Sequence, residues 1–353
     1  MAKVIVGLSG GVDSAAAAYL LKEAGHEVIG MTLRTDTQEG RCCEIDDARR
    51  TAWKLHIRYY APNVIPIFDE KVKRPFYNAY LRGLTPNPCV ECNRFVKWEQ
   101  MLSFASALDA DYVATGHYAS VVRLENGRYT VRQADFAEKD QTYMLYKLTQ
   151  EQLARTLMPL GKYSKPEVRR IAEAAGLEVA HKQDSQEVCF VTEGSYADYI
   201  EKDPALDPPG EGNFISEEGK ILGRHKGIIH YTVGQRKGLI AAGYPIYVKQ
   251  IKADTNEVVL GEEASLYRSE IRCGDLNFLS IPDLLPGEEL RAKVKIRYHH
   301  AGEWGTLRRI SDDTLRISFD APVRAPAPGQ SAVFYDEETR VIGGGIIQPE
   351  FRS

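Results

Sequence analysis

Glycines and serines near the N-terminus form a loop with the chemistry needed to hold an anion. The run Ser9-Gly10-Gly11-Val12-Asp13-Ser14 follows the apolar segment Lys3–Leu8 and precedes the Ala- and Leu-rich segment Ala15–Ala24. Adjacent glycines let the backbone turn tightly and aim its N–H groups at an anion, and the serines add hydroxyl donors. The N-terminus of the following helix adds partial positive charge. Because the Gly-x-x-x-x-Gly-Lys-Ser/Thr pattern is missing, the loop predicts a phosphate site that is not a Walker A site.

Cysteines supply a second kind of chemistry. Cys89 and Cys92 form a C-x-x-C pair in a proline-stiffened loop, and Cys189 supplies a distant third thiol. We expect Cys92 to lie close to a helix N-terminus, which would lower its pKa toward the thiolate. We interpret Cys273 and the pair Cys42-Cys43 as inert core residues. A large chain with so few cysteines is no disulfide scaffold, so reactive or metal-binding thiols are expected.

The elements that must position these residues alternate between strand and helix over the first two hundred residues. This order predicts a parallel sheet with right-handed crossovers, whose carboxyl edge carries the glycine-serine loop. Asn126-Gly127, inside the alternating segment Ser120–Ala134, predicts a hairpin. Strands are expected at Lys3–Leu8, His26–Leu33, Ile57–Val64 and Asp111–Thr115, and helices at Ala15–Ala24, Lys71–Arg82, Val96–Leu108, Gln150–Met158 and Lys165–Ala175.

The composition changes after Tyr199. The segment Asp203–Gly212 is rich in proline, glycine and acid, and short strands separated by turns follow it. We therefore expect an α/β parallel-sheet domain at residues 1–204, a small mixed domain at 205–271 and a C-terminal β-barrel at 272–353. The later strands are expected at Tyr244–Ile251, Glu257–Leu260, Glu289–Tyr298, Glu303–Ile310, Thr314–Phe319, Gln330–Tyr335 and Val341–Ile347.

Charge is distributed unevenly although the net charge is only −4. Between Glu218 and Asp254 there is no acidic residue, whereas the average acid content of the chain predicts about five. A second basic group spans Arg291 to Arg297. These basic groups indicate either solvated faces of small β domains or a surface that binds the phosphate backbone of a nucleic acid. Apolar runs are far shorter than the ~20 residues of a membrane span, and no signal pattern is present, so a cytoplasmic protein without a membrane partner is expected.

Motifs along nearly the whole chain, in collinear order, resemble those of the tRNA-specific 2-thiouridylases. That family belongs to the N-type ATP pyrophosphatases, which share an SGGxDS loop, split ATP between its α and β phosphates and adenylate a substrate. The matching motifs are Gly7–Ser14, Asn87-Pro88, Cys92-Asn93, Ala114–Tyr118, Lys139-Asp140-Gln141, Asp184-Ser185, Cys189-Phe190, Gly234–Gly238, Pro328–Tyr335 and Gly343–Ile347.

The resemblance implies a reaction and a set of roles. ATP with Mg²⁺ would activate the wobble uridine U34 in the anticodon stem-loop of tRNAs for Lys, Glu and Gln, and sulfur would replace its 2-oxygen. Cys189 would carry a persulfide received from a cysteine desulfurase or relay protein, and Cys92 would be the nucleophile that ends in a disulfide with it. ATP would bind to Gly7, Leu8, Ser9, Gly10, Gly11, Val12, Asp13, Ser14, Leu33 and Gly116, and the target base and tRNA to Asn87, Pro88, Cys89, Lys139, Asp140, Gln141, Arg297 and Tyr298.

One position departs from the family, whose members commonly carry aspartate where this chain has Cys89. A thiol cannot supply the base-like carboxylate. Cys89, Cys92 and Cys189 could instead hold a [4Fe–4S] cluster or zinc, so the persulfide relay, which we favour, the cluster and zinc stay open. His117 fits phosphate orientation, proton transfer or a structural role.

Two other classes of protein share some of these features. An ATP-dependent amide-forming synthetase would use the same loop but would not need three thiols. A tRNA-binding module would explain the basic β domains but not the loop.

Overall fold

The computed structural model describes residues 1–35, 42–182, 188–191, 194–241 and 243–349. The side chains of residues 42–44 lie outside this description, so the interpretation of Cys42 and Cys43 as core residues falls outside it as well. Within these ranges, every helix is too short or too polar to cross a membrane.

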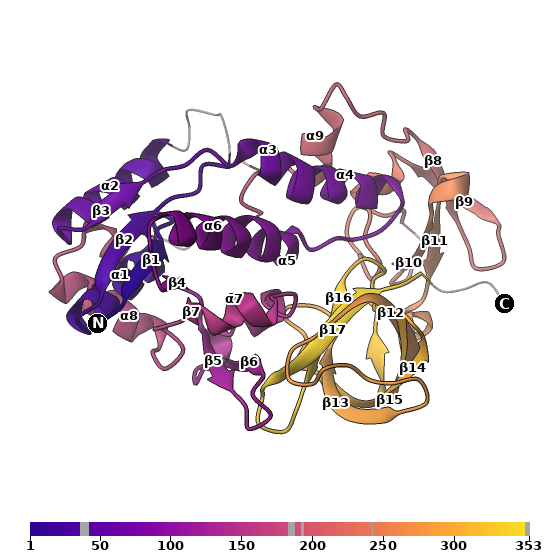
Figure 1. Ribbon diagram of the computed structural model, residues 1–353. Coiled ribbons are helices and arrows are strands. Elements are labelled where there is room, and N and C mark those ends of the chain that lie inside the picture. The colour runs from indigo at the N-terminus through magenta and orange to yellow at the C-terminus, as the bar shows by residue number, and fades with distance from the viewer. Residues whose placement is uncertain (36–41, 183–187, 192–193, 242, 350–353) are drawn as a thin grey trace.

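A five-stranded parallel sheet carries the first part of the chain (Figure 1). The expected parallel sheet is confirmed, with β1 at its centre. The sequence did not predict β7, because helix α7 (Gln150–Ala154) ends early and the chain pairs with β4 where more helix was expected. The order is β3 (Arg58–Tyr60), β2 (Glu27–Met31), β1 (Lys3–Gly7), β4 (Tyr112–Ala114) and β7 (Thr156–Leu157).

Helices cover both faces of this sheet. Val4 and Val6 point to one face and Ile5 to the other, as the two-residue repeat of a strand requires. The first face packs against α1 (Val12–Glu23), α2 (Cys42–Lys54) and α8 (Lys165–Ala174), and the second against α6 (Glu99–Ala107) and α7. Both faces are therefore buried, which fixes β1 and the loop that leaves its carboxyl end.

Short helices and a hairpin complete the N-terminal part of the chain. The hairpin of β5 (Ala119–Arg123) and β6 (Tyr129–Gln133) is found where expected, with Gly127 at φ +81° in its turn. An aromatic cluster with Phe76 and Phe190 joins these helices to the next domain. The helices are α3 (Ile65–Phe68), η2 (Asp69–Lys73), α4 (Arg74–Leu81), α5 (Pro88–Glu91), η3 (Cys92–Trp98) and α9 (Tyr196–Glu201).

Two β structures form the rest of the molecule. A small sheet has the order β10 (Tyr247–Lys252), β11 (Glu257–Gly261), β8 (Gly212–Ile215) and β9 (Ile221–His225). The expected C-terminal barrel is closed, and its first strand begins at Tyr267. Around the barrel the order is β12 (Tyr267–Phe278), β15 (Thr314–Arg324), β14 (Glu303–Ser311), β13 (Glu289–Lys295), β16 (Ser331–Tyr335) and β17 (Val341–Ile347).

The barrel holds the loop that precedes the C-x-x-C helix. The backbone N–H of Thr85 donates to the Pro328 carbonyl at 2.8 Å, and the Gln330 side chain donates to the Thr85 carbonyl at 2.8 Å. Lys147, whose side chain is 5% exposed, bridges Glu91 on α5 and Asp275 on β12, at 2.5 Å from each. Two separate polar contacts therefore fix this helix against the barrel.

Candidate active site

The glycine-serine loop lies at the carboxyl end of β1 and leads into α1. The Ser14 hydroxyl donates to the Gly11 carbonyl at 3.0 Å and accepts from the Ser9 N–H at 3.1 Å. Gly10 has φ +72°, a left-handed conformation that suits glycine. The α1 N-cap is Gly11, which has no side chain to cap the first N–H groups. The first turn of α1 therefore keeps N–H donors available for an anion.

Two other segments fix this loop from outside. Gly116 lies close to the backbone of the loop. A Cβ added to Gly116 would be 2.7 Å from the Asp13 carbonyl carbon and 2.7 Å from the Ser14 nitrogen. Asp13 accepts hydrogen bonds from the Tyr118 hydroxyl at 2.7 Å and from Lys165 Nζ at 2.8 Å to each oxygen. These contacts explain why a glycine stands at 116 and why the loop is ordered.

A cavity of about 350 Å³ opens beside the loop and reaches the thiols. Cys92 and Cys189, about a hundred residues apart in sequence, both line it. The structure therefore brings seven of the ten expected nucleotide residues together with two of the three expected thiols, whereas Gly10, Gly11 and Val12 do not line the cavity. Predicted site residues on its wall are Gly7, Leu8, Ser9, Asp13, Ser14, Leu33, Cys92, Gly116, Gln141 and Cys189.

The C-x-x-C pair begins a continuous helix over residues 88–107. Asn87 caps it, because its Oδ1 accepts from the Cys89 N–H at 3.2 Å, and Pro88 occupies the first turn. Cys92 comes after that first turn, and burial raises its pKa to about 12. Burial also raises the pKa of Cys89. The expectation of a lowered pKa at Cys92 is therefore wrong, because desolvation of the thiolate outweighs a helix dipole that acts mainly within the first turn.

Cys189 differs from the half-buried thiols of Cys89 and Cys92 because it is exposed while it also lines the cavity. The expected motif residues Asp184 and Ser185 lie outside the described residues. Cys89, Cys92, Cys189 and Cys273 are free thiols. Across the described ranges, no three Cys, His, Asp or Glu side chains meet in a geometry that could hold a metal ion. Cys273 lies in the barrel core as expected.

Lys97 is a site residue that sequence reasoning missed. It lines the cavity, and its positive charge opposes the rise in pKa at Cys89 and Cys92. Residues 92–98 form a π-helical segment with i to i+5 hydrogen bonding, which brings Lys97 toward the face of Cys92. In an ordinary α-helix, residues five apart lie on different faces. The sequence therefore did not predict that Lys97 lies near Cys92.

His117 also lines the cavity. Its Nδ1 lies 2.8 Å from the Thr115 hydroxyl, and its ring lies 5.4 Å from that of Trp98. Burial, and then the charge of Lys97, lower the pKa of His117 well below its usual value. His117 is therefore neutral at physiological pH, with Nδ1 engaged and Nε2 left for another contact.

Of the residues expected to meet the target base and tRNA, Gln141 lines the cavity, and the others lie outside its wall. Tyr298 of the barrel is half-buried, and its pKa is raised by burial and by its nearness to Asp140 and Cys89. Asp140 is 5% exposed and accepts from the Thr142 hydroxyl, so its carboxylate supports the loop from inside. Gln141 exchanges hydrogen bonds with the Tyr118 backbone. Lys139 and Arg297 are partly buried, and Arg297 donates to the Arg324 carbonyl at 2.9 Å.

A glycine-serine loop at the edge of a parallel sheet, with thiols in the same cavity, defines an N-type ATP pyrophosphatase fold adapted to thiol chemistry. Family models match three successive parts of the chain. They describe a tRNA methyl transferase HUP domain over residues 2–193, a tRNA methyl transferase PRC-barrel domain over 204–262 and an aminomethyltransferase beta-barrel domain over 268–347.

Curated relatives identify the family. The tRNA-specific 2-thiouridylase MnmA of Lachnoclostridium phytofermentans is 49% identical, over 98% of this chain and 99% of the relative. The protein of the same name from Acetivibrio thermocellus is 50% identical, over 98% of this chain and 99% of the relative. The chain belongs to the tRNA-specific 2-thiouridylase family, which confirms the resemblance.

A weaker likeness exists to a solved structure, the U34-tRNA thiolase NcsA from Methanococcus maripaludis with its [4Fe-4S] cluster. It is 22% identical with a TM-score of 0.38, over 56% of this chain and 64% of that chain. A likeness of that size carries no argument about the site.

Proposed function

We propose that this chain is a tRNA-uridine 2-sulfurtransferase that uses ATP to replace the 2-oxygen of the wobble uridine U34 with sulfur. The observation that carries the proposal is the cavity lined by both the phosphate loop and the thiols Cys92 and Cys189. Membership of the family, at 49% identity over 98% of the chain, supports the reaction. An amide-forming synthetase would not need those thiols, and a binding module would not need the loop.

The first step is adenylation of the uridine. ATP enters with Mg²⁺ and its phosphates lie on the loop of residues 7–14, where backbone and hydroxyl donors meet the anion. The base leaves the anticodon stack to reach the cavity. O2 attacks the α-phosphorus, the bond to the bridging oxygen breaks, and pyrophosphate leaves with the electron pair. Adenylation turns a poor leaving group into AMP.

Sulfur transfer then uses both cavity thiols. The terminal sulfur of a Cys189 persulfide attacks C2 of the activated base, and AMP leaves with the C2–O bond pair. The Cys92 thiolate next attacks the Cys189 sulfur, so the S–S bond breaks and the 2-thiouridine retains the terminal sulfur. A Cys92–Cys189 disulfide results, and a two-electron thiol reductant restores both cysteines.

The environments of the two thiols fit these different tasks. Cys189 is exposed and lines the cavity, so a donor protein can load it from outside while it delivers sulfur inside. Cys92 is half-buried, desolvation raises its pKa to about 12, and it needs a base before it can attack. Lys97 in the same cavity is suited to stabilise the thiolate when it forms.

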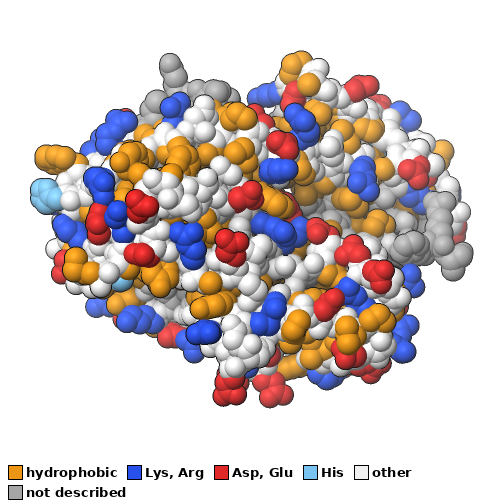
Figure 2. Space-filling view, in the orientation of Figure 1, with side chains coloured by type: hydrophobic (Ala, Val, Ile, Leu, Met, Phe, Trp, Pro, Cys, Tyr) orange, Lys and Arg blue, Asp and Glu red, His pale blue; other side chains and the backbone are white. Residues whose placement is uncertain are grey.

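The tRNA must approach across the junction of the three domains. A cleft of about 900 Å³ there is lined by residues from all three domains, including Leu84 beside the C-x-x-C loop, together with Arg82, Lys252, Arg268 and Arg272. Figure 2 shows basic and acidic side chains interspersed on one face, so a local groove fits better than a broad basic field. Tyr298 near Cys89 offers a stacking surface for a base, and the partly exposed Arg297 precedes it.

Thiolation of wobble-position tRNA by the purified chain with ATP and a sulfur donor tests the function. Cys189→Ser and Cys92→Ser should each abolish product, whereas Cys273→Ala in the barrel core should retain it. Full activity of Cys189→Ser would contradict the relay. Iron and sulfide analysis of anaerobically purified protein separates the carriers, because a stoichiometric cluster required for activity would replace the persulfide in this scheme.

A further inference from the structure

The phosphate loop must hold a polyanion, yet residues 7–14 contain no lysine or arginine and one aspartate. Within the loop, only uncharged donors, the backbone N–H groups and the serine hydroxyls, therefore face the charge of a triphosphate. Two lysines from distant parts of the chain bond to this loop, Lys165 to the Asp13 carboxylate and Lys182 to the Gly10 carbonyl. The state of each lysine decides which one is available for a phosphate.

Lys165 is engaged inside the protein. Its Nζ lies 2.8 Å from both oxygens of Asp13, and its side chain is 12% exposed. The Tyr118 hydroxyl also donates to Asp13, at 2.7 Å. Releasing Lys165 would leave a half-buried carboxylate beside an incoming anion, so this pair is better suited to maintaining the loop than to binding phosphate.

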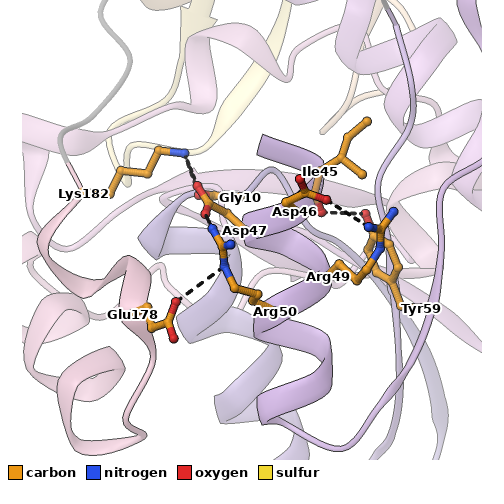
Figure 3. A network of polar contacts seen from close by, with 9 residues as sticks. All are labelled: Gly10, Ile45, Asp46, Asp47, Arg49, Arg50, Tyr59, Glu178 and Lys182. Carbon is orange, nitrogen blue, oxygen red and sulfur yellow. Dashed lines mark hydrogen bonds and ion pairs between the residues drawn. The ribbon is translucent and has the colours of Figure 1, made fainter. Parts of the chain in front are cut away.

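Lys182 has different partners, and Figure 3 shows its side chain reaching Asp47 of α2 beside Gly10 of the loop. Its Nζ donates to the Gly10 carbonyl at 3.2 Å and to Asp47 Oδ2 at 2.7 Å, and its side chain is 39% exposed. Asp47 also accepts from Arg50 at 2.5 Å, and Arg50 lies 3.5 Å from Glu178. Because Arg50 stays with Asp47, Lys182 can leave without uncovering an unpaired carboxylate.

The backbone of Lys182 is held in place while its side chain is the movable part. Arg169 on α8 donates to the carbonyls of Ala180, at 2.6 Å, and Lys182, at 3.0 Å. The Lys182 N–H donates to the Val179 carbonyl at 3.1 Å. These contacts fix the start of the side chain beside the loop, so rotation of a four-carbon stem is enough to change its partner.

We propose that Lys182 is a phosphate-binding residue of the adenylation step. When ATP enters, its ammonium exchanges Asp47 for non-bridging oxygens of the phosphates that leave as pyrophosphate. It keeps its protons and stabilises the charge that grows on the leaving group when the α-phosphorus–oxygen bond breaks. The assignment rests on the proposed use of ATP, and its test needs neither tRNA nor sulfur.

Calorimetric titration with inorganic pyrophosphate and, separately, with AMP tests this assignment. Lys182→Met should weaken pyrophosphate binding about tenfold, the lower end for a hydrogen bond to a charged group, because the side chain is partly exposed. AMP binding should change less than twofold, and Lys182→Arg should restore most of the pyrophosphate affinity. Lys162→Met, at an exposed lysine over Tyr163 before α8, is the matched control and should change neither.

Asp47→Asn separates phosphate binding from a structural role. It removes the charge that holds Lys182 in the empty site, so pyrophosphate affinity should stay the same or increase. If Lys182 only ties α2 to the loop, Asp47→Asn and Lys182→Met will weaken pyrophosphate binding alike, and the assignment fails. Equal losses for pyrophosphate and AMP, or no loss in Lys182→Met, also overturn it. A wild-type protein without thiolation activity would refute the proposed function but not a Lys182-dependent pyrophosphate site.

Discussion

Gly116→Ala is a sharp test of how closely the fold surrounds the nucleotide. The new Cβ would lie 2.7 Å from the Asp13 carbonyl carbon and 2.7 Å from the Ser14 nitrogen. Ordinary contacts of this kind begin near 3.4 Å, so the loop must move by roughly 0.7 Å. Both opposing atoms are backbone, and no side-chain rotation can relieve the overlap. Overpacking of this kind costs about 1–3 kcal/mol, which corresponds to about a fivefold to 150-fold weaker affinity for ATP if the loop yields.

Calorimetric ATP titration together with thermal unfolding checks this reasoning. Strain that the loop does not release should appear as a lower melting temperature, so the two measurements together should account for the cost. Gly210→Ala is the matched control, because no atom lies within 4 Å of its added Cβ and its backbone is not left-handed. A Gly116→Ala variant with wild-type ATP affinity and stability would refute the close approach of this segment to the loop.

Three further predictions follow from burial and charge. Since the pKa of Cys92 is about 12, its alkylation by iodoacetamide should keep accelerating up to pH 10, as followed by peptide mass spectrometry. Lys147→Met should lower the free energy of unfolding by about 2 kcal/mol in denaturant titrations, less than for a fully buried pair because Asp275 is 64% exposed. Arg236→Ala should reduce the slope of log affinity for tRNA against log salt by about 1, because the side chain is exposed in the basic segment.

Each of these three predictions has its own control and its own contradicting outcome. An alkylation rate of Cys92 that levels off below pH 9 would contradict the raised pKa of this thiol. Lys249→Met breaks a surface pair with Glu217 and should cost less than about 1 kcal/mol, so an equal cost for Lys147→Met would argue against the buried bridge. Arg58→Ala, at the β3 edge of the sheet, should leave the salt slope unchanged, and an unchanged slope for Arg236→Ala would remove that residue from the interface.

The local pattern of residue types along the sequence was sufficient to predict the parallel sheet and its phosphate loop. Alternation of apolar β-branched and Ala-rich segments predicted β1, α1 and β2 within a few residues. It failed for β7, because a strand of two residues carries no pattern of its own and exists through pairing with β4. It also failed for β12, where charged residues interrupt alternation and the pairings with β15 and β17 define the strand.

The sequence predicted which residues lie in the site better than it predicted the pKa values of their side chains. The motif identified Cys92, but its pKa depends on how much protein covers the thiol, and that cover comes from elements far away in sequence. Phe190 and Tyr199, for example, pack in the same apolar cluster as Cys92, together with residues of the small four-stranded sheet. The position of Cys92 in its helix, taken alone, therefore predicted a lowered pKa, whereas the pKa is raised.

The π-helical segment at residues 92–98 shows why one catalytic candidate escaped the sequence. Helical spacing is normally judged at 3.6 residues per turn, which rotates Lys97 away from Cys92. Widening the helix by one residue per turn realigns them, and the buried Trp98 at the end of the segment donates to Thr156 on β7 at 2.7 Å. Strand β7 therefore anchors the π-helical segment, and the sequence predicted neither of them. Tertiary pairing at one edge of the sheet determines which cation faces the thiol, and no local pattern could have revealed it.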